Sequence, residues 1–161
     1  MIKRRKLPRW LRRFLTSDNH GIATLEAAFV MPPFLFMLLL IIETGVYFIL
    51  QSALDVGVLA TAESLRTSMQ AGSGFSAPTA AALKSTINTN CGVPVGTSGL
   101  SVDVRQLATL SAGTVAIADG TDDWGGSGSV LILRAQATML FLPGFTPPII
   151  RSASVIRRPS Y

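Results

Sequence analysis

The sequence is poor in the residues that most enzyme sites require. Its 161 residues include one histidine, His20, and one cysteine, Cys91. A Ser-His-Asp triad needs a histidine beside its nucleophile, and a zinc site needs several Cys or His ligands. A glycine-rich phosphate-binding loop followed by lysine is also missing from the sequence. We therefore expect a protein that is not an enzyme and needs no cofactor.

The single cysteine also excludes a disulfide within the chain. A small, half-buried thiol is the favoured interpretation of Cys91. An intermolecular disulfide or a reactive thiol is the less favoured alternative.

Charged residues are scarce beyond the first part of the chain. Seven of the fourteen basic residues precede Gly21, against the single acid Asp18, so this leader carries a charge of +6. From Ile22 onward, seven basic and eight acidic residues leave a charge of −1. A nucleic-acid reader carries basic residues over a folded surface, so nucleic acid is not an expected partner. A basic leader before an apolar segment instead predicts a cytoplasmic N-terminus.

A long apolar segment follows the leader. Residues 22–50 contain no Lys, Arg, His, Asp, Asn or Gln and only two Glu. As a helix these 29 residues are about 43 Å long at ~1.5 Å per residue, which exceeds the ~30 Å hydrocarbon core of a bilayer. A cleaved signal peptide has a shorter apolar region, of about 7–15 residues. Arg12-Arg13-Phe14-Leu15 resembles part of a twin-arginine export signal, but the serine that precedes the two arginines in such signals is absent. A membrane anchor is therefore the favoured interpretation, and a twin-arginine signal is a minor alternative.

Four residues interrupt this segment. Glu26 lies near its start, where the positive end of the helix dipole favours an anion. Glu43 lies deeper, and either sits near the far membrane interface or contacts another helix. Pro32 and Pro33 remove two backbone donors, so they predict a kink or a locally unwound step, and they are candidates for a flexible joint.

Gly21 followed by Ile22-Ala23-Thr24-Leu25-Glu26 resembles the G-x-x-x-x-E cleavage site of prepilins, and residues 21–55 resemble the TadE-like minor pilins of tight-adherence (Tad) pili. The resemblance implies cleavage after Gly21 by a prepilin peptidase, with Ile22 as the new N-terminus and Glu26 as its fifth residue. It also implies that Glu26 neutralises an N-terminal amine as subunits pack. Ala27 departs from the family pattern, in which an aromatic residue is common at that position.

The remaining chain predicts an α+β fold. Leu54, Val58, Ala62, Leu65 and Met69 recur at helical spacing, so the helix should continue over residues 51–71 and stop at Gly72-Ser73-Gly74. A small C-terminal domain, 72–161, should then pack against it, with a short helix from Ala77 to about Thr89. We expect a largely antiparallel sheet in this pilin-like domain, with strands at Leu100–Leu110, Thr114–Ala118, Ser129–Leu142 and Ile149–Arg157. The turn between the last two strands should be longer than a tight hairpin, because of its four prolines and glycines.

One loop is a candidate metal site. Asp119, Asp122 and Asp123 lie in a glycine-rich stretch that also contains Trp124. Clustered carboxylates of this kind can bind calcium, but the spacing matches no EF-hand. A solvated turn is the favoured interpretation.

Together these features predict a pilus subunit rather than a catalyst. We expect a single-pass protein of the bacterial inner membrane, with a periplasmic C-terminal domain, that is incorporated into a pilus or its assembly complex. Its expected partners are other pilins and minor pilins, the prepilin peptidase, the membrane platform of pilus assembly and the lipid bilayer. The alternative is an uncleaved anchor that carries a periplasmic adaptor or binding domain.

Overall fold

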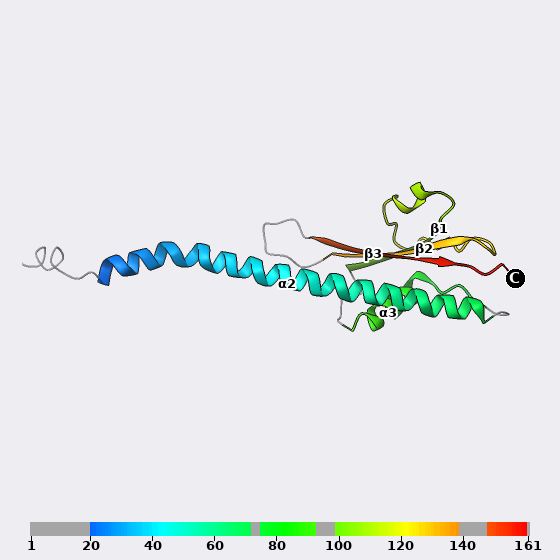
Figure 1. Ribbon diagram of the computed structural model, residues 1–161, viewed down its shortest axis with the longest axis horizontal. Helices are drawn as coiled ribbons and strands as arrows, with labels where there is room; N and C mark the ends of the chain where they lie inside the picture. Colours follow the sequence, from blue (N-terminus) through cyan, green and yellow to red (C-terminus); the bar gives the residue numbers. More distant parts are fainter. Residues whose placement is uncertain (1–19, 72–74, 93–98, 139–147, 161) are drawn as a thin grey trace, which may run out of the picture. The chain divides into compact units, whose positions relative to one another are not determined.

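The computed structural model describes residues 20–71, 75–92, 99–138 and 148–160. The order of elements is α2 (His20–Gln70), α3 (Ala80–Asn90), β1 (Leu100–Gln106), the 3-10 helix η2 (Leu110–Gly113), β2 (Val130–Thr138) and β3 (Ile149–Arg157) (Figure 1). The chain divides into two compact units, Met1–Ile42 and Glu43–Tyr161. Helix α2 contributes residues to both.

The sheet belongs to the second unit and is antiparallel throughout. Its strand order is β1-β2-β3. Asp103 of β1 lies opposite Arg134 of β2, and Arg134 lies opposite Ala153 of β3. A long N-terminal helix followed by a small antiparallel sheet confirms the α+β prediction.

The C-terminal part of α2 packs against one face of this sheet. The five positions predicted to form an apolar stripe, Leu54, Val58, Ala62, Leu65 and Met69, are all buried. They join a core cluster with alternate residues of the strands, among them Val102, Val104, Leu131, Leu133 and Ile150. Alternation places these strand residues on one face of the sheet, and the helical period places the stripe on one side of α2, so the two apolar surfaces cover each other.

Helix α3 lies on the same face of the sheet. It begins at Ala80, and the hydroxyl of Thr79 caps it by accepting a hydrogen bond from the amide of Ala82. Leu83 and Ile87, four residues apart, are its buried residues. The short helix expected from Ala77 is therefore confirmed, with its start moved past Pro78 to the Thr79 cap.

Two strand predictions need correction. Thr114–Ala118 is not a strand; it is a turn and irregular segment that follows η2. Its carbonyl at Val115 accepts a hydrogen bond from Arg134 of β2, which lies 19 residues away. The strand from Leu100 ends at Gln106 rather than Leu110. By contrast, β3 has the predicted bounds, Ile149–Arg157.

Several sequence predictions lie outside the described residues. These are the structure of the basic leader up to residue 19, the stop at Gly72-Ser73-Gly74, most of the loop after Cys91, and the last four positions of the predicted strand Ser129–Leu142. Residues 139–147, in the connection between β2 and β3, belong to the same group. The prediction that the turn between the last two strands is longer than a tight hairpin therefore stays a prediction, because this turn lies outside the described residues.

Candidate membrane and assembly segment

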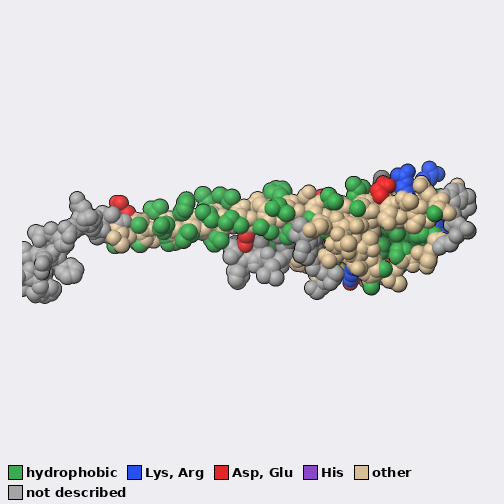
Figure 2. All heavy atoms as spheres, turned by 90° about the horizontal axis from the view of Figure 1, so that it is seen from below, with side chains coloured by type: hydrophobic (Ala, Val, Ile, Leu, Met, Phe, Trp, Pro, Cys, Tyr) green, Lys and Arg blue, Asp and Glu red, His purple; other side chains and the backbone are tan. Residues whose placement is uncertain are grey.

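The first unit contains the apolar N-terminal part of α2. From Leu25 to Ile42 its large hydrophobic side chains are exposed, Phe29 by 74% and Ile41 by 67%. Figure 2 shows hydrophobic side chains along this part of the helix on the visible face. Each such side chain gains about 1.5–3 kcal/mol when it leaves water, so this surface requires a bilayer or other protein around it.

The apolar part of this helix is long enough to span the hydrocarbon core of a bilayer. Within the described part of the chain, it is the single helix with sufficient length and apolar character to cross a membrane. The 19 residues from Thr24 to Ile42 rise about 28 Å, close to the ~30 Å hydrocarbon core. One N-terminal apolar helix fits a single-pass membrane protein.

The expected cleavage position lies at the start of α2. The helix begins at His20, so the backbone of Gly21 and Ile22 is in its first turn. Glu26 is exposed and lies nearly two turns from that start. Because the dipole effect falls off beyond the first turn, Glu26 gains little from it in the uncleaved chain. Cleavage before Ile22 would place Glu26 about one turn from the start of the helix, where the dipole acts.

Pro32 and Pro33 lie within α2, which is assigned as one unbroken helix from His20 to Gln70. The locally unwound step that the sequence allowed is therefore wrong. Each proline still lacks a backbone donor, which leaves the carbonyls of Ala28 and Phe29 without their usual helical partners.

Glu43 is the first residue of the second unit. It is half-buried, and among the described residues nothing hydrogen-bonds its buried carboxylate atom Oε2. A buried acceptor without a donor is costly. Glu43 therefore has an acceptor atom that no described residue satisfies.

The aspartate-rich loop is held by contacts within the chain. Lys84 Nζ lies 2.6 Å from Asp119 Oδ2, and the amide of Val102 donates to Asp119 Oδ1 at 3.2 Å. The hydrogen bond from Lys84 lowers the pKa of Asp119 below its ordinary value. Asp123 accepts from the amide of Gly125, and the described residues contain no group of three His, Cys, Asp or Glu that could hold a metal ion.

The same loop extends the sheet beyond β1. Asp122 forms a parallel bridge with Val104, supported by hydrogen bonds from the amide of Val104 to Thr121 and from the amide of Asp123 to Val104. Trp124 packs edge-on against Phe75 at 5.7 Å. The aromatic pair anchors the loop, and the aspartates lie within a structural segment.

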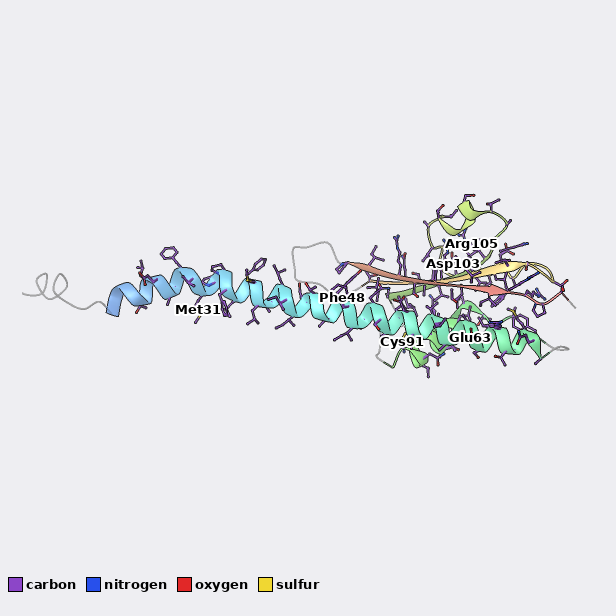
Figure 3. The ribbon with its side chains drawn as sticks, in the orientation of Figure 1. Met31, Phe48, Glu63, Cys91, Asp103 and Arg105 are labelled. Atoms are coloured by element: carbon purple, nitrogen blue, oxygen red, sulfur yellow. The ribbon has the colours of Figure 1, made fainter. Side chains whose placement is uncertain are left out.

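The buried polar centre of the second unit was missed in the sequence. Asp103 is fully buried and Arg134 is 4% exposed. Arg134 Nε donates to Asp103 Oδ1 at 2.9 Å, and Arg134 Nη1 donates to the carbonyls of Gly113 and Val115. These bonds hold the η2 segment over the sheet face opposite α2, where Asp103 and Arg105 also lie (Figure 3). One sequence signal could have indicated this pair. Asp103 and Arg134 are opposite charges that each lie inside a segment expected to be a strand.

Cys91 lies at the crossing of α2 and α3. It is 6% exposed, and burial raises the pKa of its thiol. A side-chain carbon added at Gly57 would collide with Cys91 Sγ and would lie 2.9 Å from the carbonyl oxygen of Ile87. The small thiol and the glycine thus permit a close approach of the two helices.

Comparison with known proteins gives one match. Residues 21–63 match the model of the TadE family, described as TadE-like protein. No curated protein and no solved structure matches the chain. The matched segment begins at Gly21 and covers the apolar part of α2 with both of its glutamates, which confirms the resemblance over these residues and suggests association with a Tad pilus.

Proposed function

We propose that this chain, whose residues 21–63 match TadE-like proteins, is a minor pilin or pseudopilin of a Tad-type pilus. The N-terminal part of α2 anchors it in the bacterial inner membrane. The basic leader stays in the cytoplasm, and the second unit lies in the periplasm. The protein contributes to pilus assembly or initiation and is not an enzyme.

One observation carries this proposal. The family match begins at Gly21, the residue that separates a +6 leader from an apolar helix, and Glu26 lies exposed on that helix. A simple anchor has no need of a carboxylate there, because an acid near the bilayer interior carries a cost. A subunit that packs its own N-terminus into an assembly does need one.

The chemistry of cleavage supplies the reason. Hydrolysis of the bond between Gly21 and Ile22 leaves an ammonium group on Ile22. In an apolar packing environment an unpaired charge is expensive, and the carboxylate of Glu26 neutralises such a group when subunits assemble. Glycine is the least stable residue in a helix apart from proline, by about 1 kcal/mol relative to alanine, so the first turn at Gly21 opens readily for a protease.

The proposed partners follow from the exposed surfaces. Lipid covers the apolar part of α2 before assembly, and the helices of other pilins and minor pilins cover it afterwards. The prepilin peptidase and the membrane platform of pilus assembly act on the protein between these two states. Glu43 is half-buried and one of its oxygens has no partner among the described residues, which supports a further contact with a neighbouring helix.

The N-terminus of the mature protein tests the proposal. We expect mass spectrometry to find Ile22 as the first residue when the protein is produced with its prepilin peptidase, and the leader intact when the peptidase is absent. A Gly21→Ala variant should remain uncleaved or be cleaved slowly. An N-terminus at Met1 or Ile2 in both strains would instead favour an uncleaved anchor with a periplasmic adaptor domain.

The role of Glu26 needs a separate measurement. Glu26→Ala should still be inserted and cleaved, but its incorporation into pili or assembly complexes should fall strongly. Glu63→Ala is a matched control, because Glu63 is an exposed glutamate of the same helix whose partner, Arg66, is exposed as well. Normal assembly of Glu26→Ala would contradict charge pairing at this position.

A further inference from the structure

One edge of β3 has no partner strand in the part of the chain that the structure describes. β3 is the last strand in the sheet order. The amide of Arg158 donates to the carbonyl of Ser129, and the register places these two residues opposite each other. Since hydrogen-bonded and non-hydrogen-bonded pairs alternate in an antiparallel ladder, residues 153, 155 and 157 direct their N–H and C=O groups away from β2.

This open edge has defined ends. The carbonyl of Arg151 points outward too, but Gln51 Nε2 of α2 already donates to it at 2.9 Å. At the other end Pro159 has no N–H to offer, and its carbonyl accepts from the amide of Gly128. About five residues of strand, 153–157, are left with room for a partner.

A groove runs beside this stretch of edge. Its volume is about 680 Å³, and α2 forms one wall and β3 with the following residues the other. The lining residues are Ala62, Glu63, Arg66 and Gln70 of α2 together with residues 154–160. A groove between a helix and an edge strand has the form that receives an extended peptide by strand addition.

The groove is rich in positive charge. Arg66 and Arg157 line it along with one acid, Glu63, which lies 3.8 Å from Arg66 with both side chains more than half exposed. Figure 2 shows basic side chains beside an acidic one in this region of the second unit. Arg157 has no ion-pair partner among the described residues. Arg158 differs, because it donates to the carbonyls of Trp124 and Gly125 and is thus already engaged.

We propose that residues 153–157 of β3 bind an extended, acidic segment of another protein as a fourth strand of the sheet. The outward backbone groups supply the hydrogen bonds. Arg66 on the α2 side and Arg157 on the opposite face of the sheet select acidic side chains on the two faces of the added strand. A second copy of this chain is a poor occupant, because its own edge presents the same arginines and like charges across paired strands repel. This inference goes beyond the proposed function and does not depend on it, since cleavage after Gly21 leaves the second unit unchanged.

A synthetic peptide tests the inference on the full chain in detergent micelles. The probe is a fluorescein-labelled peptide of repeated Thr-Thr-Glu-Glu, which as a strand carries glutamate on both faces, and binding is measured by fluorescence anisotropy. Two control peptides isolate the two contributions: one has lysine in place of glutamate, and one is N-methylated at the backbone nitrogens of every second residue. We expect saturable binding of the acidic peptide and a loss of about tenfold or more for each control.

Variants of the chain localise the binding. Arg157→Glu should weaken binding about tenfold, whereas Arg151→Glu, a matched reversal on the same strand outside the groove lining, should change it about twofold or less. Val155→Pro should abolish binding, because it removes an outward N–H in the centre of the open edge. Circular dichroism establishes that this variant is folded; if it is not, the N-methylated peptide decides the point alone.

Three outcomes would overturn the inference. They are the absence of binding by the acidic peptide, equal binding of the N-methylated peptide, and equal effects of the two arginine reversals. Absence of binding would mean that the arginines serve only to prevent pairing at this edge. Equal binding of the N-methylated peptide would exclude strand addition. Equal effects of the two arginine reversals would mean that the contact is nonspecific charge attraction.

Discussion

At the scale of single residues, Asp103 is the fully buried carboxylate of the second unit. Arg134 and Arg105 both donate to its carboxylate, and Arg134 reaches across to the η2 segment. A buried pair of this kind gains little over an apolar replacement but becomes expensive when one member is removed. The η2 segment therefore depends on a contact that no local sequence pattern contains.

We expect Asp103→Ala to lower the free energy of unfolding by about 3–5 kcal/mol, because it leaves the Arg134 guanidinium buried without its counter-ion. Replacing both residues, as in Asp103→Leu with Arg134→Met, should cost clearly less. Glu63→Ala, which removes an exposed ion pair, should change the value by at most about 1 kcal/mol. Urea unfolding of the full chain in micelles, followed by circular dichroism, measures all three. A double variant as unstable as Asp103→Ala would contradict this account.

Asp119 gives the second unit a small dependence on pH. Its pKa is lowered by the hydrogen bond from Lys84. A carboxyl whose pKa is lower in the folded state stabilises that state above its unfolded pKa, and the stabilisation disappears as the pH falls through the folded pKa. Because half of the Asp119 side chain is exposed, solvent screens the pair and its contribution is at most about 1 kcal/mol.

Asp119→Asn should therefore be slightly less stable than the native chain at pH 7. The difference should shrink below the ordinary aspartate value of 3.8, where the native carboxyl is protonated as well. Melting temperatures measured from neutral pH down to the acid limb provide the comparison. A difference that is constant over this range would show that the Lys84 contact is not electrostatic.

At the scale of elements, the crossing of α2 and α3 is set by one glycine. A side-chain carbon at Gly57 would meet Cys91 Sγ and the carbonyl oxygen of Ile87, whereas nothing lies within 4 Å of such a carbon at Gly45 in the same helix. The backbone carbonyl cannot move aside as a flexible side chain can. The crossing therefore tolerates no larger residue at position 57.

We expect Gly57→Ala to destabilise the second unit by about 1–3 kcal/mol through overpacking. Gly45→Ala should be neutral or slightly stabilising, because alanine is the better helix former by about 1 kcal/mol. Thermal unfolding of the two variants in the same detergent compares them directly. Adding Cys91→Ala to Gly57→Ala should restore only part of the loss, since the clash with the Ile87 carbonyl remains.

The elements differ in how far the sequence specified them. The stripe from Leu54 to Met69 and the strand Ile149–Arg157 follow from local periodicity, because each has one face against the core. Thr114–Ala118 has strand-forming residues but pairs with no strand that the structure describes. Its backbone is held by Arg134 from a distant part of the chain. Tertiary contact overrides β propensity there.

The candidate sites follow the same logic. Gly21, Ile22 and Glu26 could be proposed from the sequence alone, because the pattern that they form is a spacing along one helix. Two other features depend on residues that are distant in the sequence, so spacing does not reveal them. They are the ion pair of Asp119 with Lys84 and the Glu43 oxygen that no described residue satisfies. The open edge of β3 could not be inferred either, since the strand order had to be known first.

At the scale of the whole molecule, charge and apolarity are divided between the ends of the chain. The leader holds seven basic residues, the first unit exposes an apolar helix, and the second unit has a buried core of its own. This division predicts an orientation in the membrane, because basic residues next to a span are retained in the cytoplasm.

Replacing the seven basic leader residues with glutamine should disturb that orientation. Each lysine or arginine near an anionic membrane surface contributes about 1 kcal/mol, so their joint removal is a large change. Alkaline phosphatase fused after Ser160 should be active with the native leader and lose much of its activity with the neutral one. Arg151→Gln, in the second unit, is the control and should leave the activity unchanged. Equal activity of both leaders would contradict the orientation.

The close contact of Cys91 with Gly57 has a consequence for export of the second unit across the membrane. On the proposed route the second unit enters an oxidising compartment with an unmatched thiol, and a mixed disulfide with another protein would trap it there. Attack requires an accessible thiolate. Helix packing leaves Cys91 only 6% exposed and raises the pKa of its thiol, so it lowers both the access and the ionised fraction. On the proposed route the thiol is therefore most open to oxidation before α3 packs on α2, and this packing protects it afterwards.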